Sequence, residues 1–507
     1  MTKLGILLLL ASLFVLSGCN RNFADIPPHE PLTLQDVLSI AQERREGIEK
    51  PEIDSISHLF QERGGTAVNR ARFRTTGRIP EMISSQRLID DFNMFSNALR
   101  QRYGLYIYFG GDDVFLPLFE QVNETLALQE YWYIDDFSNL VFDTLSYVID
   151  DLHFIFGGRF VGGEIVGGRI LGDMHDFFVP TNFSDVFDKS ENGSRNRRTG
   201  LYVQELHFDG KPLCSETEEV FRLMMCNNGM FYYSIVVVRP SGGAETVNVT
   251  ILYENGRYDE VYFSPFITTM REFVNVSLQY IQGFPVITIM GMFFPNRDVD
   301  SPYFTMHNYY ANKFLDLAEE VRDEPVIIVD IRSNGGGNGN LSEMWLHSVV
   351  GEVVPTNFLS VVNIGDYLQL DLECLYSAMK LVCESYALMY TMPHGIIPNE
   401  QLIILLTDRY TGSAGDTFAS SLFSLENALV IGQNTTGVII GNVGGEFGGT
   451  IGGKPLLPNS GVAFAFGNSA NIFPPGFMLE GIGIAPDIWV NGDALEATLA
   501  MLGASSF

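Results

Sequence analysis

The chain has 507 residues, of which 46% are hydrophobic and 12% aromatic. This composition excludes a disordered protein and allows several domains with cores of their own. The chain carries 31 basic and 61 acidic residues, a formal net charge of −30. Because such a surface repels phosphate, nucleic acid is not an expected partner, and the excess of acidic residues indicates a solubilising surface.

The first residues have the pattern of a bacterial export signal. Lys3 precedes an apolar stretch over 4–16 that is too short to span a bilayer as an ordinary helix, and small residues follow it. We expect a signal peptide over 1–18. The tetrapeptide LSGC (16–19) resembles the lipobox of bacterial lipoproteins, whose cysteine is lipidated and becomes the new N-terminus. The resemblance implies a lipid anchor at Cys19 to a membrane of the bacterial cell envelope, on its periplasmic or surface face, with ordinary secretion as the alternative.

Four cysteines remain beyond the signal, and in an oxidising compartment they allow three pairings. Closeness in sequence favours Cys214 with Cys226 and Cys374 with Cys383, and buried free thiols are the alternative. No CxxC motif or Cys/His spacing indicates zinc, so no metal site is expected.

The N-terminal third divides into two parts. Residues 19–80 combine prolines with many charges, which predicts a tether with a short helix over 34–50. Over 81–160, apolar residues recur at spacings of three and four, in particular over 85–104 and 135–153. This period is typical of amphipathic helices, so a helical subdomain is expected.

A strand-rich stretch follows over 185–270, with a helix expected at ETEEVFRLM (216–224). This texture resembles the PDZ-like module that often accompanies exported proteases. The resemblance implies a small α+β module whose open sheet edge accepts a peptide strand.

Strands and helices alternate over 275–497, which predicts an α/β core with buried strands. Within this core, residues 352–398 carry LYSAMKLVCESYALMY (375–390) and are expected to form a helical insertion. The strands are expected over 284–292, 325–332, 401–409 and 428–433, and the helices over 308–322 and 413–425.

Ser413 lies where one of these strands gives way to a helix, in the segment TGSAGDTFA (411–419). A serine nucleophile needs a base, a group that orients the base, and donors for the oxyanion. The amides of a first helical turn point outward, so the N–H of Ala414 would be one oxyanion donor. The local alternative is that Ser413 is only a helix N-cap, with Asp416 completing a capping-box-like pair.

A second candidate segment is VIIVDIRSNGGGNGN (326–340), a buried strand that ends at Asp330 and Arg332 and continues into three glycines. Glycine lets the backbone approach a ligand closely, so an amide of Gly336 or Gly337 would be the second oxyanion donor. An ordinary glycine-rich strand exit is the alternative.

Four segments, in this order, resemble the signature of the S41 peptidase family, which includes the C-terminal-processing or tail-specific proteases and the tricorn-like proteases. The segments are IIVDIRSNGGG (327–337), TGSAGDTFA (411–419), GQNTTG (432–437) and EGIGIAPDIWV (480–490). The resemblance covers about 275–497 and extends to the helical subdomain. It implies a ClpP/crotonase-like core of ββα units and a serine endopeptidase that cleaves extracytoplasmic proteins or peptides through an acyl-enzyme, without a cofactor.

The family uses two kinds of base. Its lysine-dependent branch has a lysine directly after the glycine of a TxG motif, but Val438 follows Gly437 here. A Ser/Lys dyad with Lys454 is therefore disfavoured. The tricorn-like branch uses a histidine, commonly in a DxH motif after the helical subdomain, and Asp151 to His153 match that position.

The same branch carries a glutamate behind the histidine, and Glu480 matches its position. The resemblance therefore implies Ser413 as nucleophile, His153 as base and Glu480 as the residue that orients it. Asp487, in a proline-fixed turn, is expected to be structural. The alternative function is a catalytically inactive S41-like lipoprotein that binds peptides or hydrophobic ligands, and Asp416, where many family members have glutamate, keeps it open.

Overall fold

The computed structural model describes a large part of the chain, in a series of segments. The predicted signal peptide over 1–18, Cys19, Glu480 and Lys454 lie outside these segments, as do Cys214 and Cys374. No helix in the described segments is long and apolar enough to cross a membrane. The described residues are 32–46, 73, 80–160, 163–166, 169–172, 175–180, 186–190, 193–208, 210–212, 220–240, 246–265, 271, 276–292, 304–363, 379–383, 386–390, 396–438, 455–473 and 481–504.

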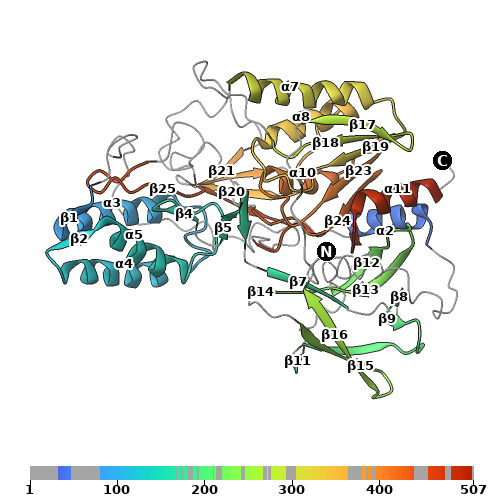
Figure 1. Cartoon of the computed structure of the whole chain (residues 1–507), viewed down its shortest axis with the longest axis horizontal. Helices are drawn as coiled ribbons and strands as arrows, with labels where there is room; N and C mark the ends of the chain where they lie inside the picture. The colour runs from blue at the N-terminus through green and yellow to red at the C-terminus, as the bar shows by residue number, and fades with distance from the viewer. Residues whose placement is uncertain are drawn as a thin grey trace, which may run out of the picture.

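A ten-stranded mixed sheet forms the centre of the molecule (Figure 1). Neighbouring strands run parallel from β18 to β12. The alternation of strands and helices over 275–497 predicts an α/β core with buried strands, and β12 joins it from outside that stretch. Its strands, in spatial order, are β17 (Ser277–Ile281), β18 (Phe284–Thr288), β19 (Val326–Asp330), β23 (Leu402–Thr407), β24 (Ala428–Gly432), β27 (Ile488–Val490), β12 (Phe221–Met225), β13 (Phe231–Ile235), β8 (Phe187–Ser190) and β9 (Gly193–Asn196).

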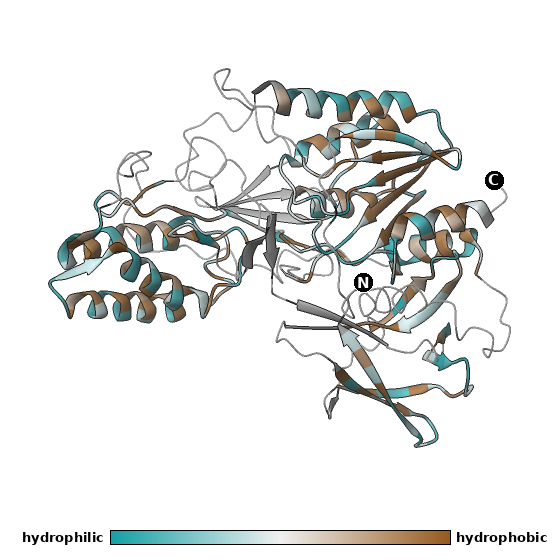
Figure 2. Cartoon of the chain, viewed as in Figure 1, coloured by the Kyte–Doolittle hydropathy of each residue, from teal (hydrophilic) through white to brown (hydrophobic). Residues whose placement is uncertain are grey.

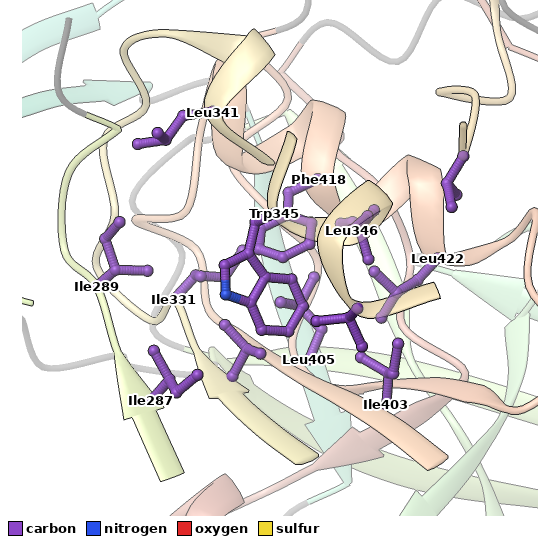
Figure 3. Close-up of a cluster of buried hydrophobic side chains, with 14 of the residues drawn as sticks. Ile287, Ile289, Ile331, Leu341, Trp345, Leu346, Ile403, Leu405, Phe418 and Leu422 are labelled. Carbon is purple, nitrogen blue, oxygen red and sulfur yellow. The ribbon is translucent and has the colours of Figure 1, made fainter. Parts of the chain in front are cut away.

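Helices cover both faces of the parallel part of this sheet, so its strands are apolar throughout (Figure 2). One face packs against α7 (Phe304–Val321), α8 (Gly339–Val350) and α10 (Ala414–Leu422). On this face Trp345 stacks on Phe314 and meets Phe418 edge-on (Figure 3). The other face packs against α2 (Leu34–Glu46) and α11 (Ala494–Ala504). The core is thus a three-layer α/β structure, as expected.

The helical subdomain has a separate hydrophobic core, built from α3 (Ser85–Arg102), α4 (Gly111–Ala127) and α5 (Ile134–Ser146). Part of this core comes from 455–473, which lies far away in the sequence and runs along the helices (Figure 1). In that segment Phe464 pairs with Phe156 in a small sheet. The subdomain is therefore attached to the C-terminal half of the chain. The short strands here are β1 (Met82–Ser84), β2 (Tyr131–Tyr133), β3 (Ile155–Phe156), β4 (Arg159–Phe160), β5 (Gly163–Val166), β6 (Arg169–Gly172) and β25 (Phe464–Ala465).

The stretch predicted as one module over 185–270 divides between two sheets. Strands β8, β9, β12 and β13 belong to the central sheet, and the others form a six-stranded sheet with β7. The helix predicted over 216–224 is wrong from Phe221 onward. There β12 pairs with β13 and β27, and this pairing outweighs the local helical pattern. The six-stranded sheet contains β7 (His175–Pro180), β10 (Val203–Phe208), β11 (Lys211–Pro212), β14 (Val237–Pro240), β15 (Val247–Tyr253) and β16 (Tyr258–Pro265).

The helical insertion predicted over 352–398 is also wrong where the structure describes strands, over 359–363, 379–383 and 386–390. Strands β20 (Leu359–Asn363), β21 (Met379–Cys383) and β22 (Tyr386–Tyr390) form an antiparallel sheet with β26 (Ser469–Ile472). The spacing of apolar residues over 375–390 suits a helix, but the strands in this stretch pair with each other and with β20, which pairs in turn with the distant β26.

Candidate active site

Ser413 occupies a strained turn between β23 and α10. Its backbone has φ 55 and ψ −113, a region that residues other than glycine rarely occupy. A sharp strand-turn-helix arrangement of this kind exposes a nucleophilic serine in other hydrolases. The Ser413 side chain makes no capping hydrogen bond, so the reading of Ser413 as a simple side-chain N-cap does not hold.

His153 lies against this serine. Its Nε2 is 3.5 Å from Ser413 Oγ, although 260 residues separate the two. His153 follows α5 and is separated from β3 by Phe154, and the carboxylate of Asp151 accepts its backbone N–H at 2.7 Å. Burial lowers the pKa of the imidazole to about 4, so the ring is neutral at neutral pH and can accept a proton.

The other ring nitrogen of His153, Nδ1, is buried and has no hydrogen-bond partner among the described residues. A buried polar atom of this kind calls for a partner. The predicted partner, Glu480, lies outside the described residues, but the residue after it, Gly481, donates its N–H to the carbonyl of Gly437 at 2.9 Å. Val438, the next residue, packs against Leu152, the neighbour of His153.

Gly336 lies directly against the nucleophile. A Cβ at this position would come within 2.5 Å of Ser413 Cβ and 2.9 Å of the Ala414 nitrogen, so only glycine fits. The Gly336 N–H itself donates to Asn334 Oδ1 at 2.9 Å. Gly337 lies opposite Met292 in an isolated β-bridge. In this bridge the Met292 N–H donates to the carbonyl of Gly336, and the Met292 carbonyl accepts the N–H of Asn338. The N–H of Gly337 consequently has no acceptor among the described residues.

Polar residues at the ends of β19 and β23 hold these two loops together. The buried carboxylate of Asp408 accepts the N–H of Ser333 at 2.7 Å and the hydroxyl of Thr411 at 3.1 Å. The carbonyl of Asn334 accepts the N–H of Gly412 at 2.9 Å. Because β19 and β23 are parallel neighbours, their carboxyl ends meet at one edge of the sheet. Asn334, Asp408 and Thr411 were not predicted as site residues, although each follows a buried strand closely.

The other two signature segments join the same edge. Thr436 donates its N–H to the carbonyl of Thr411 at 2.6 Å, and Thr435 pairs with Ile484 in both directions. The four segments that resemble the family signature are therefore neighbours in space. Asp487, in the last of them, forms a buried ion pair with Arg45 at 2.8 Å, which agrees with its expected structural role.

The described residues contain no group of three or more His, Cys, Asp or Glu side chains that could hold a metal ion. The arrangement brings together a serine hydroxyl, a neutral imidazole and free backbone amides. These are the parts that acyl transfer through a serine nucleophile requires.

The geometry defines the site of a serine hydrolase. Residues 302–490 match the model of peptidase family S41. The matched stretch contains Ser413, and the protein is a serine-type peptidase. No curated protein sequence matches the chain.

Among solved structures, mature CPAF complexed with lactacystin is similar at 13% identity and a TM-score of 0.39, over 83% of this chain and 98% of the other. A lipoprotein from Streptococcus agalactiae is similar at 13% identity and a TM-score of 0.38, over 85% of this chain and 99% of the other. A putative peptidase from Parabacteroides merdae is similar at 13% identity and a TM-score of 0.39, over 84% of this chain and 98% of the other. These likenesses carry no residue assignment.

Proposed function

We propose that the protein is a serine endopeptidase in which His153 is the general base for Ser413. The single observation that carries this proposal is the 3.5 Å approach of His153 Nε2 to Ser413 Oγ across two separate parts of the fold. The neutral imidazole takes the hydroxyl proton while Oγ attacks the carbonyl carbon of a peptide bond. The proton then passes to the departing amine, and water releases the acyl group from Ser413 by the same route in reverse.

The tetrahedral intermediate carries a negative oxygen that needs backbone donors. Ala414 N–H supplies the first, since it begins α10 and no acceptor for it is present among the described residues. Gly336 remains the predicted second donor, but its N–H already donates to Asn334. The Gly337 N–H, which has no such bond, is the alternative.

Glu480 orients His153 in this proposal. The buried Nδ1 of His153 requires an acceptor, and a carboxylate there stabilises the imidazolium formed during the reaction. The hydrogen bond from Gly481 to Gly437 supports the assignment, because Val438 next to Gly437 packs on the residue before His153.

The proposed substrates are extracytoplasmic proteins or peptides. The enzyme is proposed to carry a lipid anchor at Cys19, which places it outside the cytoplasm. The LSGC tetrapeptide after a short apolar segment supports this location. The anchor is tested by metabolic labelling with an alkyne fatty acid in a bacterial host. Wild-type protein should incorporate the label and Cys19→Ala should not.

The catalytic proposal is tested with a fluorophosphonate probe, which labels activated serines covalently. Mature wild-type protein should be labelled and should cleave an unstructured protein substrate, whereas Ser413→Ala should do neither. Ser421→Ala, a buried serine further along α10, is the matched control and should be labelled like the wild type. An unlabelled wild type, with peptide binding intact in Ser413→Ala, would instead indicate a binding protein.

A further inference from the structure

Asp416 is a buried carboxylate in the first turn of α10, three residues after the nucleophile. Its side chain is 1% exposed, and no ion pair with a cation involves it among the described residues. A charge in such surroundings is stable only if hydrogen-bond donors surround it. Asp416 has them: its two oxygens accept the N–H of Gly437 at 3.1 Å and the N–H of Val438 at 3.0 Å. Burial raises the pKa of this carboxyl to about 7, and hydrogen bonding from Thr435 and from the Ser413 backbone opposes that shift.

These donors belong to segments that meet at the catalytic residues. Ser413 is the nucleophile of the proposed mechanism. Val438 forms a buried cluster with Leu152, the residue before the base. The carbonyl of Gly437 accepts the N–H of Gly481, the residue that follows Glu480. One carboxyl group therefore lies in the same helical turn as the nucleophile and accepts hydrogen bonds from the segment that packs beside His153.

We propose that Asp416 is a positioning residue that fixes the strained Ser413 turn at its distance from His153. The inference rests on the proposed function, because it assigns the residue a role through Ser413 rather than on the substrate. Ser413 occupies an unfavourable backbone conformation, so it must be held there by its surroundings. Asp416 lies in the first helical turn after Ser413 and ties that turn to the backbone of Gly437 and Val438. Misplacement of a catalytic group by about 1 Å can cost about 100-fold in rate.

The chemistry of the side chain matters more than its shape. A carboxylate has only acceptors, and each of its two oxygens accepts two bonds. An asparagine of the same shape has one acceptor oxygen and turns an NH₂ group toward N–H donors. Asp416→Asn should therefore loosen the turn while it preserves the volume of the side chain.

The experiment compares Asp416→Asn with wild type in steady-state hydrolysis and in the rate of fluorophosphonate labelling. We expect kcat to fall about 100-fold, KM to stay within about threefold, and labelling to slow in parallel with kcat. Asn196→Ala is the control for a merely structural loss. Its buried amide accepts the N–H of Arg198 and of Thr199 in a turn beyond β9, so it should lower the melting temperature without a change in kcat.

An Asp416→Asn enzyme with wild-type kcat and labelling rate would overturn the inference, as would a fall in kcat/KM that comes from KM alone. If that variant does not fold, Thr435→Val and Thr435→Ser take its place. The valine variant loses one donor to Asp416 and should lower kcat about tenfold with KM unchanged, and the serine variant should restore it. Equal kcat in the two variants would equally overturn it. Failure of the proposed function is seen separately, as labelling that persists in Ser413→Ala.

Discussion

His153 Nε2 and Ser413 Oγ lie 3.5 Å apart, yet the residues that follow them, Phe154 and Ala414, belong to different hydrophobic cores. Ser413 begins a helix of the α/β core, and His153 directly follows the helical subdomain. The pairing of Phe156 with Phe464, in a segment that returns from the C-terminal half, holds the two parts in register. In the proposed mechanism, catalysis depends on that docking as well as on the residues that react.

Replacement of the base should remove activity and leave the fold intact. His153→Ala should lower kcat by about 10²- to 10⁴-fold, because a positioned general base contributes that much and no other base bonds to the hydroxyl among the described residues. Steady-state hydrolysis of a fluorogenic peptide measures this. His347→Ala, which changes an exposed histidine on α8, should retain full activity. Comparable activity in the two variants would contradict the assignment.

Replacement of Glu480, the proposed orienting carboxylate, should reduce kcat even though Ser413 is still present. We expect Glu480→Gln to lower kcat by roughly 10³- to 10⁴-fold, since a triad histidine without its carboxylate adopts the wrong tautomer. Glu496→Gln on α11 is an exposed control and should behave as wild type. If Glu480→Gln hydrolyses the substrate at the wild-type rate, another group must accept the hydrogen of His153 Nδ1.

Patterns that are local in the chain predict this fold best. The buried strands β19, β23 and β24 and the helix after Ser413 follow from apolar runs and helical spacing, because both faces of the central sheet are covered. Strand β12 and the sheet of β20, β21 and β22 do not follow. Strand β12 pairs with β27 and β20 pairs with β26, both distant in the sequence, and this pairing overrides the local pattern.

The catalytic residues show the same division. Ser413 alone is indistinguishable from a helix cap, and His153 alone is an ordinary histidine at the end of a helix. The four ordered segments indicated both, through a resemblance to a family. The supporting residues Asp408 and Asn334 were not predicted as part of the site, because their hydrogen bonds join loops that are distant in sequence. The polar residues that follow each buried parallel strand were the signal available.

The N-terminal helix α2 should contribute to stability through one buried ion pair. Arg45 and Asp487 lie 2.8 Å apart with side chains 1% and 2% exposed, and Arg45 also donates to the carbonyls of Leu425 and Ala428. Arg45→Ala leaves the carboxylate buried without its cation, so we expect the free energy of unfolding to fall by about 3–5 kcal/mol. Chemical denaturation measures this.

The neighbouring arginine provides the control for that pair. Arg44 lies 3.7 Å from the same carboxylate, and its side chain is 42% exposed. Because solvent screens such a pair, Arg44→Ala should cost no more than about 1 kcal/mol. Equal losses for the two variants would show that the burial of Arg45 has no special weight.

Asp151 should make stability depend on pH. Burial raises the pKa of its carboxyl to about 6, against hydrogen bonds from Tyr103, His153 and Phe154 that lower it. Relative to an unfolded pKa near 3.8, the folded protein binds more protons between about pH 4 and 6. The contribution of Asp151 to stability therefore falls as the pH rises through that window, and its loss is complete above it.

Asp151→Asn keeps an acceptor for the His153 N–H but cannot titrate. Between pH 4 and 6, the free energy of unfolding of wild type should fall relative to that of Asp151→Asn, as measured by denaturation at several pH values. Asp151→Leu removes the acceptor itself, so the turn that carries His153 loosens and kcat should fall at least about tenfold further than in the asparagine variant. Parallel pH profiles for wild type and Asp151→Asn would mean that this carboxyl does not titrate in the window. Equal kcat in Asp151→Asn and Asp151→Leu would mean that His153 is held by the pairing of β3 with β25 alone.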